Sequence, residues 1–342
     1  MNVKHALSFD DVLLVPQYSR IKSRKEIDLS VEAKNVSKKF EIPIVSAPMD
    51  SITELAMVIA MDRLGGLGII HRYNTIDEQA KIAQEAFYTG ANNIAAAIGM
   101  TDDYYVRAEE LVKAGANILC VDVAHGHHRM MQECLDRLKS KFGDEVHLMA
   151  GNVATLEAFN DLADWGADSI RVGIGGGSIC STRIQTGHGV PTLQSVIYCS
   201  RSDRDALLIA DGGIKNSGDM VKALAAGADM VMCGSLLSGT DETPGDVIQS
   251  LDGRARKVYR GMASREAQKS WRDKVGSVEG IATTVDVKGP VDRVVKDLSW
   301  GIKSGLSYSG CTHLREFASR SRLIQQTAAG AKESNTHILN VV

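Results

Sequence analysis

The sequence has few cysteines and no pattern that links them. Its six cysteines, at positions 120, 134, 180, 199, 233 and 311, have unrelated spacings and include no Cys-x-x-Cys pair. A disulfide framework and a structural zinc site both need regular cysteine spacing, so neither is predicted. Most of the six are expected to be reduced thiols in the core, the common environment of free cysteine.

An excess of positive charge and long apolar runs are lacking as well. The formal net charge is -3 and the pI is about 6.3, so a surface that binds nucleic acid or anionic membranes is not indicated. No apolar run reaches the ~18 residues of a membrane span, and the opening MNVKHALSFDD lacks the apolar core of a signal peptide. We therefore expect a cytoplasmic protein.

A four-residue sequence recurs along the chain. It reads TGAN at 89–92, AGAN at 114–117, WGAD at 165–168 and AGAD at 226–229. Amphipathic stretches such as 155–165 and 218–226 lead into it, and a short apolar run follows it each time. This order predicts a helix, a glycine at the helix C-terminus and then a buried strand.

Eight short apolar runs fit such strands. They lie at 42–47, 67–70, 93–99, 118–124, 146–151, 169–175, 207–212 and 230–234. Runs that are apolar throughout indicate a parallel sheet covered on both faces. We predict an α/β protein with one (β/α)8 TIM-barrel domain over residues 1–342, a doubly wound open sheet being the alternative. The segment before residue 40 is expected to cap the barrel bottom, and the segment after about 240 to hold a functional excursion.

The longest connection between these runs follows 169–175 and reads GGGSICSTRIQTGHGVP. Loops after strand C-termini build the active sites of barrels, and successive glycines let the backbone approach a ligand closely. Cys180 in this loop is therefore a candidate nucleophile. A buried structural cysteine is the alternative, because no adjacent histidine is present to activate the thiol.

Two neighbouring strands end in small residues suited to a phosphate. Asp211 is followed by Gly212 and Gly213, and Gly234 by Ser235. Barrel phosphate sites often follow the seventh and eighth strands, and a carboxylate there can accept both ribose hydroxyls. Glycines that only make tight turns are the alternative.

Asp122 ends another strand and is a candidate for binding a second ligand. The nearby histidines 125, 127 and 128 are interpreted as solvated loop residues, because their spacing is not that of a helical zinc site. No GxGxxG pattern follows the first strand with an acidic partner downstream, so a Rossmann cofactor site is not predicted.

Seven motifs together resemble the IMP dehydrogenase/GMP reductase family over nearly the whole chain. They are FDDVLLVP (9–16), SAPMDS (46–51), VGIGGGSICSTRIQTGHGVP (172–191), ADGGIKNSGD (210–219), CGSLLSGTDETPG (233–245), YRGM (259–262) and EG…KGPV (279–291). The long motif around Cys180 is the most specific of them.

The resemblance implies a covalent bond between Cys180 and purine C2, with hydride passing between that carbon and a nicotinamide. It assigns proton transfer to Thr182 and Glu279. The matching nucleotide site consists of Ser46, Met49, Ser178, Asp211, Gly213, Gly234, Ser235, Tyr259, Gly261 and Met262. The residues that would face the nicotinamide are Asp122, Asn152 and Gly173.

The resemblance also implies a homotetramer, and a potassium ion on the backbone carbonyls of Gly175, Gly177 and Cys180. Gly176 departs from the pattern, since the family usually has proline there, and we expect it to loosen the loop. A flap at about 259–290 and a C-terminal tail at about 318–342 complete the expected domain.

Motifs for two reactions are mixed in this chain. Dehydrogenases of the family usually carry a regulatory CBS pair inserted in the barrel, and the run from HRYNT (71–75) into the next helix leaves no room for it. They also use an Arg-Tyr pair on the flap to activate water, whereas this flap has Trp271-Arg272 instead. DVA (122–124) and KSR (22–24) look reductase-like, but SAPMD, GTDETPG and the tail KESNTH (332–337) look dehydrogenase-like.

We predict NADPH-dependent reductive deamination of GMP to IMP and ammonia, because ammonia loss needs no water-activating arginine. The alternative is an IMP dehydrogenase without CBS domains that oxidises IMP to XMP with NAD. Two further alternatives are a barrel that binds purine nucleotides without turnover and a flavin-dependent barrel oxidoreductase.

Overall fold

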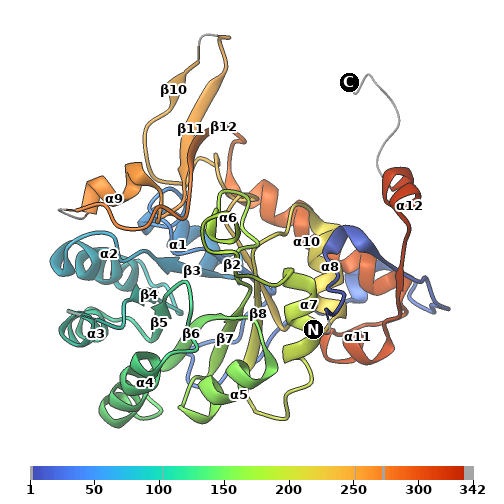
Figure 1. Ribbon diagram of the computed structural model, residues 1–342, viewed down its shortest axis with the longest axis horizontal. Coiled ribbons are helices and arrows are strands. Elements are labelled where there is room, and N and C mark those ends of the chain that lie inside the picture. Colours follow the sequence, from blue (N-terminus) through green and yellow to red (C-terminus); the bar gives the residue numbers. More distant parts are fainter. Residues whose placement is uncertain (1–2, 102, 251, 272–273, 335–342) are drawn as a thin grey trace.

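Eight parallel strands close into a barrel in the computed structural model (Figure 1), which describes residues 3–101, 103–250, 252–271 and 274–334. The strands are β2 (Ile44–Ser46), β3 (Leu67–Ile70), β4 (Ala95–Ile98), β5 (Ile118–Asp122), β6 (His147–Val153), β7 (Ser169–Val172), β8 (Leu207–Asp211) and β9 (Met230–Cys233). β2 pairs with both β3 and β9, which closes the sheet. The predicted (β/α)8 barrel is confirmed, and the open sheet is wrong.

The barrel interior is filled with side chains. The inward-facing residues form one buried apolar cluster: Val45, Leu67, Ile69, Ala95, Ala97, Ile118, Cys120, Met149, Ile209, Met230 and Met232. Val31 and Phe40 join this cluster and pair with each other across a short bridge. Residues 31–40 therefore cap the barrel bottom, so the prediction for the segment before residue 40 is confirmed for this part, whereas Val12–Leu14 pair elsewhere.

The recurring four-residue junction has one structure at all four places. Its glycines, at 90, 115, 166 and 227, have φ of +82°, +102°, +101° and +109°, a left-handed conformation that favours glycine. The residue after each glycine donates its N–H to a carbonyl five residues back, as Ala116 does to Leu111 (2.9 Å). This is the Schellman ending that the sequence predicts.

The last residue of three junctions fixes the neighbouring strand. Asn117 Oδ1 accepts a hydrogen bond from Ile94 N (2.8 Å), Asp168 Oδ2 from Leu148 N (2.8 Å) and Asp229 Oδ2 from Leu208 N (2.7 Å). These bonds tie each strand to its neighbour at the bottom of the barrel. They help to set the register between neighbouring strands, and this register aligns the carboxyl ends of the strands at the other end of the barrel.

Helices cover the outside of the barrel. They are α1 (Leu55–Arg63), α2 (Ile76–Tyr88), α3 (Tyr104–Lys113), α4 (Arg129–Phe142), α5 (Leu156–Asp164), α7 (Thr192–Cys199), α8 (Ser217–Ala225) and α10 (Val291–Tyr308), while the short α6 (Thr182–Thr186) lies in the loop after β7. Among the described residues, none of the helices combines the length and apolar character needed to cross a membrane.

The excursion after β9 rises from the barrel as a three-stranded antiparallel sheet (Figure 1). Its strands are β10 (Ile248–Gln249), β11 (Ala255–Arg260) and β12 (Ala282–Asp286), with α9 (Arg265–Trp271) between the last two. Buried Lys257 anchors its base, because its ammonium donates to the carbonyls of Thr240 (3.0 Å), Asp241 (3.1 Å) and Thr243 (2.7 Å).

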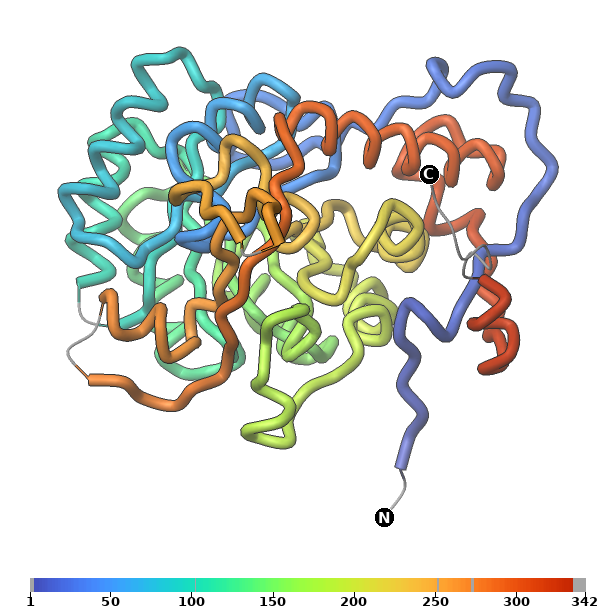
Figure 2. Tube along the Cα trace, turned by 90° about the horizontal axis from the view of Figure 1, so that it is seen from above, coloured from blue at the N-terminus to red at the C-terminus, as the bar shows by residue number. Residues whose placement is uncertain are grey.

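Described segments from near the two ends of the chain come together on one side of the barrel (Figure 2). Strand β1 (Val12–Leu14) pairs antiparallel with β13 (Leu323–Gln325). In the sequence, β13 lies between α11 (Leu314–Arg320) and α12 (Ala328–Glu333), and β1 lies between the 3-10 turns Phe9–Asp11 and Arg24–Glu26. The sequence predicts a tail here but not this strand, whose short run LIQ lacks a recognisable pattern. Residues 335–337 of the dehydrogenase-like KESNTH lie outside the described residues.

Asp229→Asn is expected to stabilise the protein. Burial raises the pKa of Asp229 to about 6 from an ordinary 3.8, although the hydrogen bond from Leu208 N lowers it. Ionised Asp229 therefore lowers the free energy of unfolding. The whole cost is present above about pH 6, where Asp229 is ionised in the folded protein too, and it disappears below about pH 3.8, where Asp229 is protonated in both states. Asparagine keeps the acceptor, as Asn117 does, and should raise the free energy of unfolding by about 1–3 kcal/mol near neutral pH.

Urea unfolding at about pH 8 and about pH 4 checks this, with the gain expected only at the higher pH. Asp168→Asn is the matched control, since Asp168 Oδ1 already accepts from Asn35 Nδ2 (3.2 Å) and an amide there would place two donors together. A gain that is equal at both pH values would contradict the account.

Candidate active site

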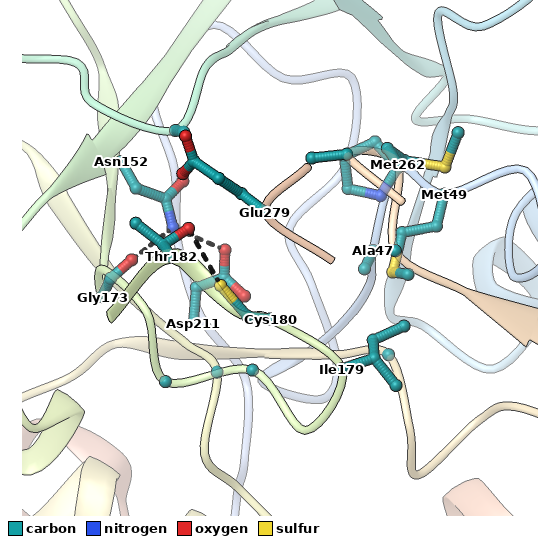
Figure 3. A pocket seen from close by; sticks show the side chains of 18 of the residues that line it. Ala47, Met49, Asn152, Gly173, Ile179, Cys180, Thr182, Asp211, Met262 and Glu279 are labelled. Carbon is teal, nitrogen blue, oxygen red and sulfur yellow. Dashed lines mark hydrogen bonds between the residues drawn. The ribbon is translucent and has the colours of Figure 1, made fainter. Parts of the chain in front are cut away.

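A cavity of about 460 Å³ opens at the carboxyl ends of the barrel strands, within the size range of small-molecule sites. The predicted residues that line it are Met49, Asp122, Asn152, Gly173, Gly175, Gly177, Ser178, Cys180, Thr182, Asp211, Gly213, Gly234, Ser235, Tyr259, Gly261, Met262 and Glu279. Figure 3 shows Cys180, Thr182 and Asp211 together on one side, and Met49 with Met262 on the other. The structure thus gathers residues from six of the seven motifs, together with Asp122 and Asn152.

Ser46 is the predicted site residue that the structure does not place in this lining. It is fully buried at the end of β2, and its hydroxyl lies 2.8 Å from Thr53 Oγ1. Ala47 lines the cavity instead, because successive side chains along a strand point to opposite faces. The Ser46 side chain thus supports the loop through Thr53 and does not line the cavity.

The cysteine loop and the flap meet in a short antiparallel bridge. Ser181 N donates to Glu279 O (2.9 Å), and Ile281 N donates to Ile179 O (3.0 Å). This pairing holds Glu279 beside Cys180, although almost a hundred residues separate them. Cys180 Sγ also lies 3.2 Å from Thr182 Oγ1, at the start of α6.

Cys180 differs from the other cysteines in its exposure. It is partly exposed, whereas the other five are buried. Burial raises the pKa of Cys120, Cys134 and Cys199 to about 12, so these thiols stay protonated and unreactive. The expectation that most cysteines are core residues is therefore met, and the alternative of a buried Cys180 is wrong.

Asp122 and Asp211 share a buried arginine that the sequence analysis missed. Arg171, on β7, forms ion pairs with both carboxylates; its Nη2 lies 2.8 Å from Asp211 Oδ2, and its Nη1 contacts Asp122 Oδ1. Burial lowers the pKa of Arg171, but the two carboxylates raise it well above its ordinary value. A charged residue inside an apolar strand run is the signal that could have identified it.

Asn152 presents an acceptor to the same region. Its Nδ2 donates to Gly173 O (2.8 Å) and Asp211 Oδ2 (2.8 Å), which fixes the orientation of the amide (Figure 3). Its Oδ1 is buried, and no described residue donates to it. A carboxamide N–H of a nicotinamide fits this acceptor, so the residues present suit that cofactor.

The end of the cavity near β8 and β9 presents hydroxyls and backbone N–H groups. Tyr259 Oη lies 3.5 Å from Ser178 Oγ, and burial raises the pKa of Tyr259. Gly234 lies close to this hydroxyl, because a Cβ there would be 3.1 Å from the Tyr259 oxygen. Gly213 has φ of +76°, which favours glycine. Together these groups can bind a phosphate without a lysine or arginine.

An ion pair holds the two methionines of the cavity wall, Met49 and Met262, in place. Arg260 Nη2 lies 2.6 Å from Asp50 Oδ2 and also 3.2 Å from Ser270 Oγ on α9. Asp50 N lies 3.4 Å from Met262 Sδ. Arg260 therefore joins the loop that carries Met49 to the flap, a role that its place in the YRGM motif does not reveal.

Gly176 does not leave open space in the loop. A Cβ at this position would lie 2.4 Å from Thr192 Oγ1, so Gly176 and Thr192 fit each other. Gly177 O accepts from Cys180 N (3.1 Å), and the Arg183 guanidinium cross-links Ile174 O and Val190 O. These bonds hold the loop together, and the potassium ion on the carbonyls of Gly175, Gly177 and Cys180 stays a prediction.

Aromatic side chains and a second arginine complete the cavity wall. Arg72 Nε lies 3.7 Å from Asp122 Oδ2, and its guanidinium lies 5.0 Å from the centre of the Tyr73 ring. Tyr73 in turn contacts Trp271 of the flap, with ring centres 4.9 Å apart.

Two further segments singled out in the sequence are the flap pair Trp271-Arg272 and the histidine-rich loop. Arg272, the other predicted flap residue, lies outside the described residues. His127, from the histidine-rich loop, pairs with Asp161 (2.8 Å).

The fold and this cavity define an α/β-barrel protein with a cysteine loop and a flap over one ligand-sized site. Residues 6–337 match the family model for the IMP dehydrogenase / GMP reductase domain. The chain therefore belongs to the IMP dehydrogenase/GMP reductase family of purine-nucleotide oxidoreductases, as the motifs predict.

Similar proteins carry both names. Inosine-5'-monophosphate dehydrogenase of Nitrosopumilus maritimus is 33% identical over 475 residues, covering 98% of this chain and 99% of that protein. The enzyme of the same name from Cryptosporidium parvum is 37% identical over 396 residues, covering 100% and 97%. A cysteine-to-alanine variant of Trypanosoma brucei GMP reductase in complex with guanosine 5'-monophosphate has a TM-score of 0.92, 31% identity and 99% coverage of both chains.

Both alignments are longer than this chain of 342 residues. More than a hundred positions in the Nitrosopumilus alignment therefore have no counterpart here. The sequence predicts such a shortfall, because it has no room for a CBS pair.

Cys180 is expected to be the first cysteine that iodoacetamide alkylates. It alone among the six is not buried, and the thiolate is the reactive form. Peptide mass spectrometry after brief labelling should show modification of Cys180 at least about tenfold faster than of the other thiols. Cys180→Ala is the control, and rapid labelling of Cys120 or Cys233 in the folded protein would contradict the structure.

Proposed function

We propose that the protein is a GMP reductase, which converts GMP to IMP and ammonia with NADPH as the reductant. One observation supports oxidoreductase chemistry at Cys180 above the others, and the flap sequence then favours the reductase. Cys180 Sγ lies 3.2 Å from Thr182 Oγ1, and Glu279 lines the same cavity. A nucleophile and two groups able to move a proton thus face the same cavity. Next to them is Asn152 Oδ1, which can accept a hydrogen bond from the carboxamide of a nicotinamide.

The phosphate of GMP binds between Ser178, Gly213, Ser235 and Tyr259, and the ribose binds Asp211. The purine then lies between the methionine pair and Cys180, whose sulfur attacks C2. A C–S bond forms, the bond from C2 to the exocyclic nitrogen breaks, and the nitrogen leaves as ammonia with a proton that passes through Thr182 and Glu279.

When bound, a nicotinamide would supply the hydride that C2 requires, and the Cys180 sulfur would then be the leaving group that releases IMP. Asn152 and Asp122 would hold the cofactor, while Trp271 and Tyr73 wall that side of the cavity. The flap helps exclude water, because its backbone is paired to the cysteine loop at Cys180 and Gly280.

The flap sequence favours ammonia loss over hydrolysis. Between Met262 and Glu279 there is no tyrosine, so the Arg-Tyr pair that the family resemblance implies for activating water is missing. Arg265 in this segment is exposed and does not line the cavity. The remaining proton-transfer groups are those that ammonia loss requires.

IMP dehydrogenase activity is the second candidate, and the names of the similar proteins favour it. Both reactions pass through a bond between Cys180 and C2, so they differ only in what happens next. The purified protein should oxidise NADPH when GMP is present, followed by absorbance at 340 nm, and release ammonia in equal amount. Turnover only with IMP and NAD would overturn the reductase and establish the dehydrogenase.

Glu279→Gln is expected to lower kcat for GMP by about 10²- to 10⁴-fold, the usual contribution of a general acid or base. The KM for GMP should change little, because Glu279 takes no part in binding phosphate or ribose. Glu266→Gln is the matched control, since Glu266 is exposed on α9 and does not line the cavity. Loss of nucleotide binding in Glu279→Gln would contradict a role limited to proton transfer.

A further inference from the structure

Asp211 has one oxygen that is fully engaged and one that is free. Its Oδ2 accepts three hydrogen bonds, from Arg171 Nε (3.2 Å), Arg171 Nη2 (2.8 Å) and Asn152 Nδ2 (2.8 Å). Within the described residues, no hydrogen bond reaches Oδ1. The carboxylate is therefore held in one orientation, with its unused oxygen left for a ligand.

The same guanidinium orients a second carboxylate. Arg171 Nη1 forms an ion pair with Asp122 Oδ1 and lies 3.6 Å from Cys120 Sγ. Asp122 Oδ2 remains, with Arg72 Nε 3.7 Å away. All three nitrogens of Arg171 thus face the two acidic groups, and its side chain is only 8% exposed.

The barrel makes room for this arginine. Gly151, on the adjacent strand β6, could not be any larger residue, because a Cβ there would lie 2.6 Å from Arg171 Cβ and 2.9 Å from its carbonyl oxygen. Without the cation, two carboxylates would share the cavity mouth, where like charges repel. A planar guanidinium can span both groups, whereas a lysine ammonium is a single point charge.

We propose that Arg171 is a positioning residue that sets ribose specificity. It fixes Asp211 so that Oδ1 accepts the ribose hydroxyls of the nucleotide, and it holds Asp122 toward the cofactor. The proposal rests on the proposed function, in that it requires a purine ribonucleotide in this cavity. It does not depend on which of the two reactions the protein runs.

The test measures binding of IMP and 2′-deoxy-IMP by isothermal titration calorimetry, since IMP takes part in both reactions. The parent should bind IMP about ten- to a hundredfold tighter than 2′-deoxy-IMP, the range of a hydrogen bond to a charged group. In Arg171→Met this ratio should fall to about two or less. The loss should arise from weaker IMP binding, with 2′-deoxy-IMP affected much less.

Three variants show whether the effect passes through Asp211. Asp211→Asn should reduce the ratio like Arg171→Met, and the double variant should be no worse than either, because both remove one arrangement. Arg171→Lys keeps a positive charge and should restore part of the ratio; it also serves if the methionine variant does not fold. Arg107→Met is the matched control, because Arg107 is equally buried (7%) but bonds Asp103 and Gln79 outside the cavity.

The outcomes are distinct. A ratio that stays at the parent value in both folded Arg171 variants would overturn this inference and leave the proposed function standing. Failure of the parent to bind IMP at all would overturn the proposed function and this inference with it. A ratio reduced equally in Arg107→Met would show a general structural effect, which also overturns the inference.

Discussion

The pairing of β2 with β9 is the constraint on which the site depends. It turns an apolar sheet into a closed ring, so the carboxyl ends of all eight strands meet at one rim. Asp122 ends β5, Asn152 lies in β6, Cys180 follows β7 and Asp211 ends β8. These residues are spread over ninety positions of sequence, yet the ring brings them around a single cavity. An open sheet would separate the groups on its two edge strands.

Charge inside this ring needs compensation. Transferring a carboxylate from water into a protein is costly unless a cation and hydrogen bonds accompany it. Arg171 and Asn152 supply these for Asp211, while Arg171 and Arg72 flank Asp122. Under the proposed function, the phosphate binds to neutral groups because it brings its own charge. The cavity thus has a charged centre between the hydroxyl groups near β8 and β9 and the apolar side chains of Met49 and Met262.

Much of the fold could be predicted because its signals are local. The glycine of each junction needs a left-handed φ, and the apolar runs mark buried strands whatever they pair with. The short pairing of β1 with β13 could not be foreseen, because three residues at each end of the chain carry no pattern of their own. The predicted strand at 169–175 was too long, since Gly173, with φ of +147°, ends the extended run after Val172.

The site could be predicted where a motif identifies its residues. It could be predicted less well where the role of a residue depends on the side chains that it contacts in the fold. Cys180, Thr182 and Glu279 were identified by motif, and the structure brings them to one cavity. Ser46 was taken from a motif too, but its direction depends on the pleat of β2. Arg171 escaped notice because its partners come from β5 and β8, which no sequence spacing reveals. The predicted homotetramer, potassium ion and cofactor identity stay predictions.

The bridge between Cys180 and Gly280 joins two segments that the chain encodes far apart. In the proposed reaction Cys180 and Thr182 belong to the barrel, whereas Glu279 belongs to the excursion after β9. Under the proposed function, substitutions in α9 can therefore alter the fate of the intermediate while Cys180 and Asp211 keep their places on the barrel.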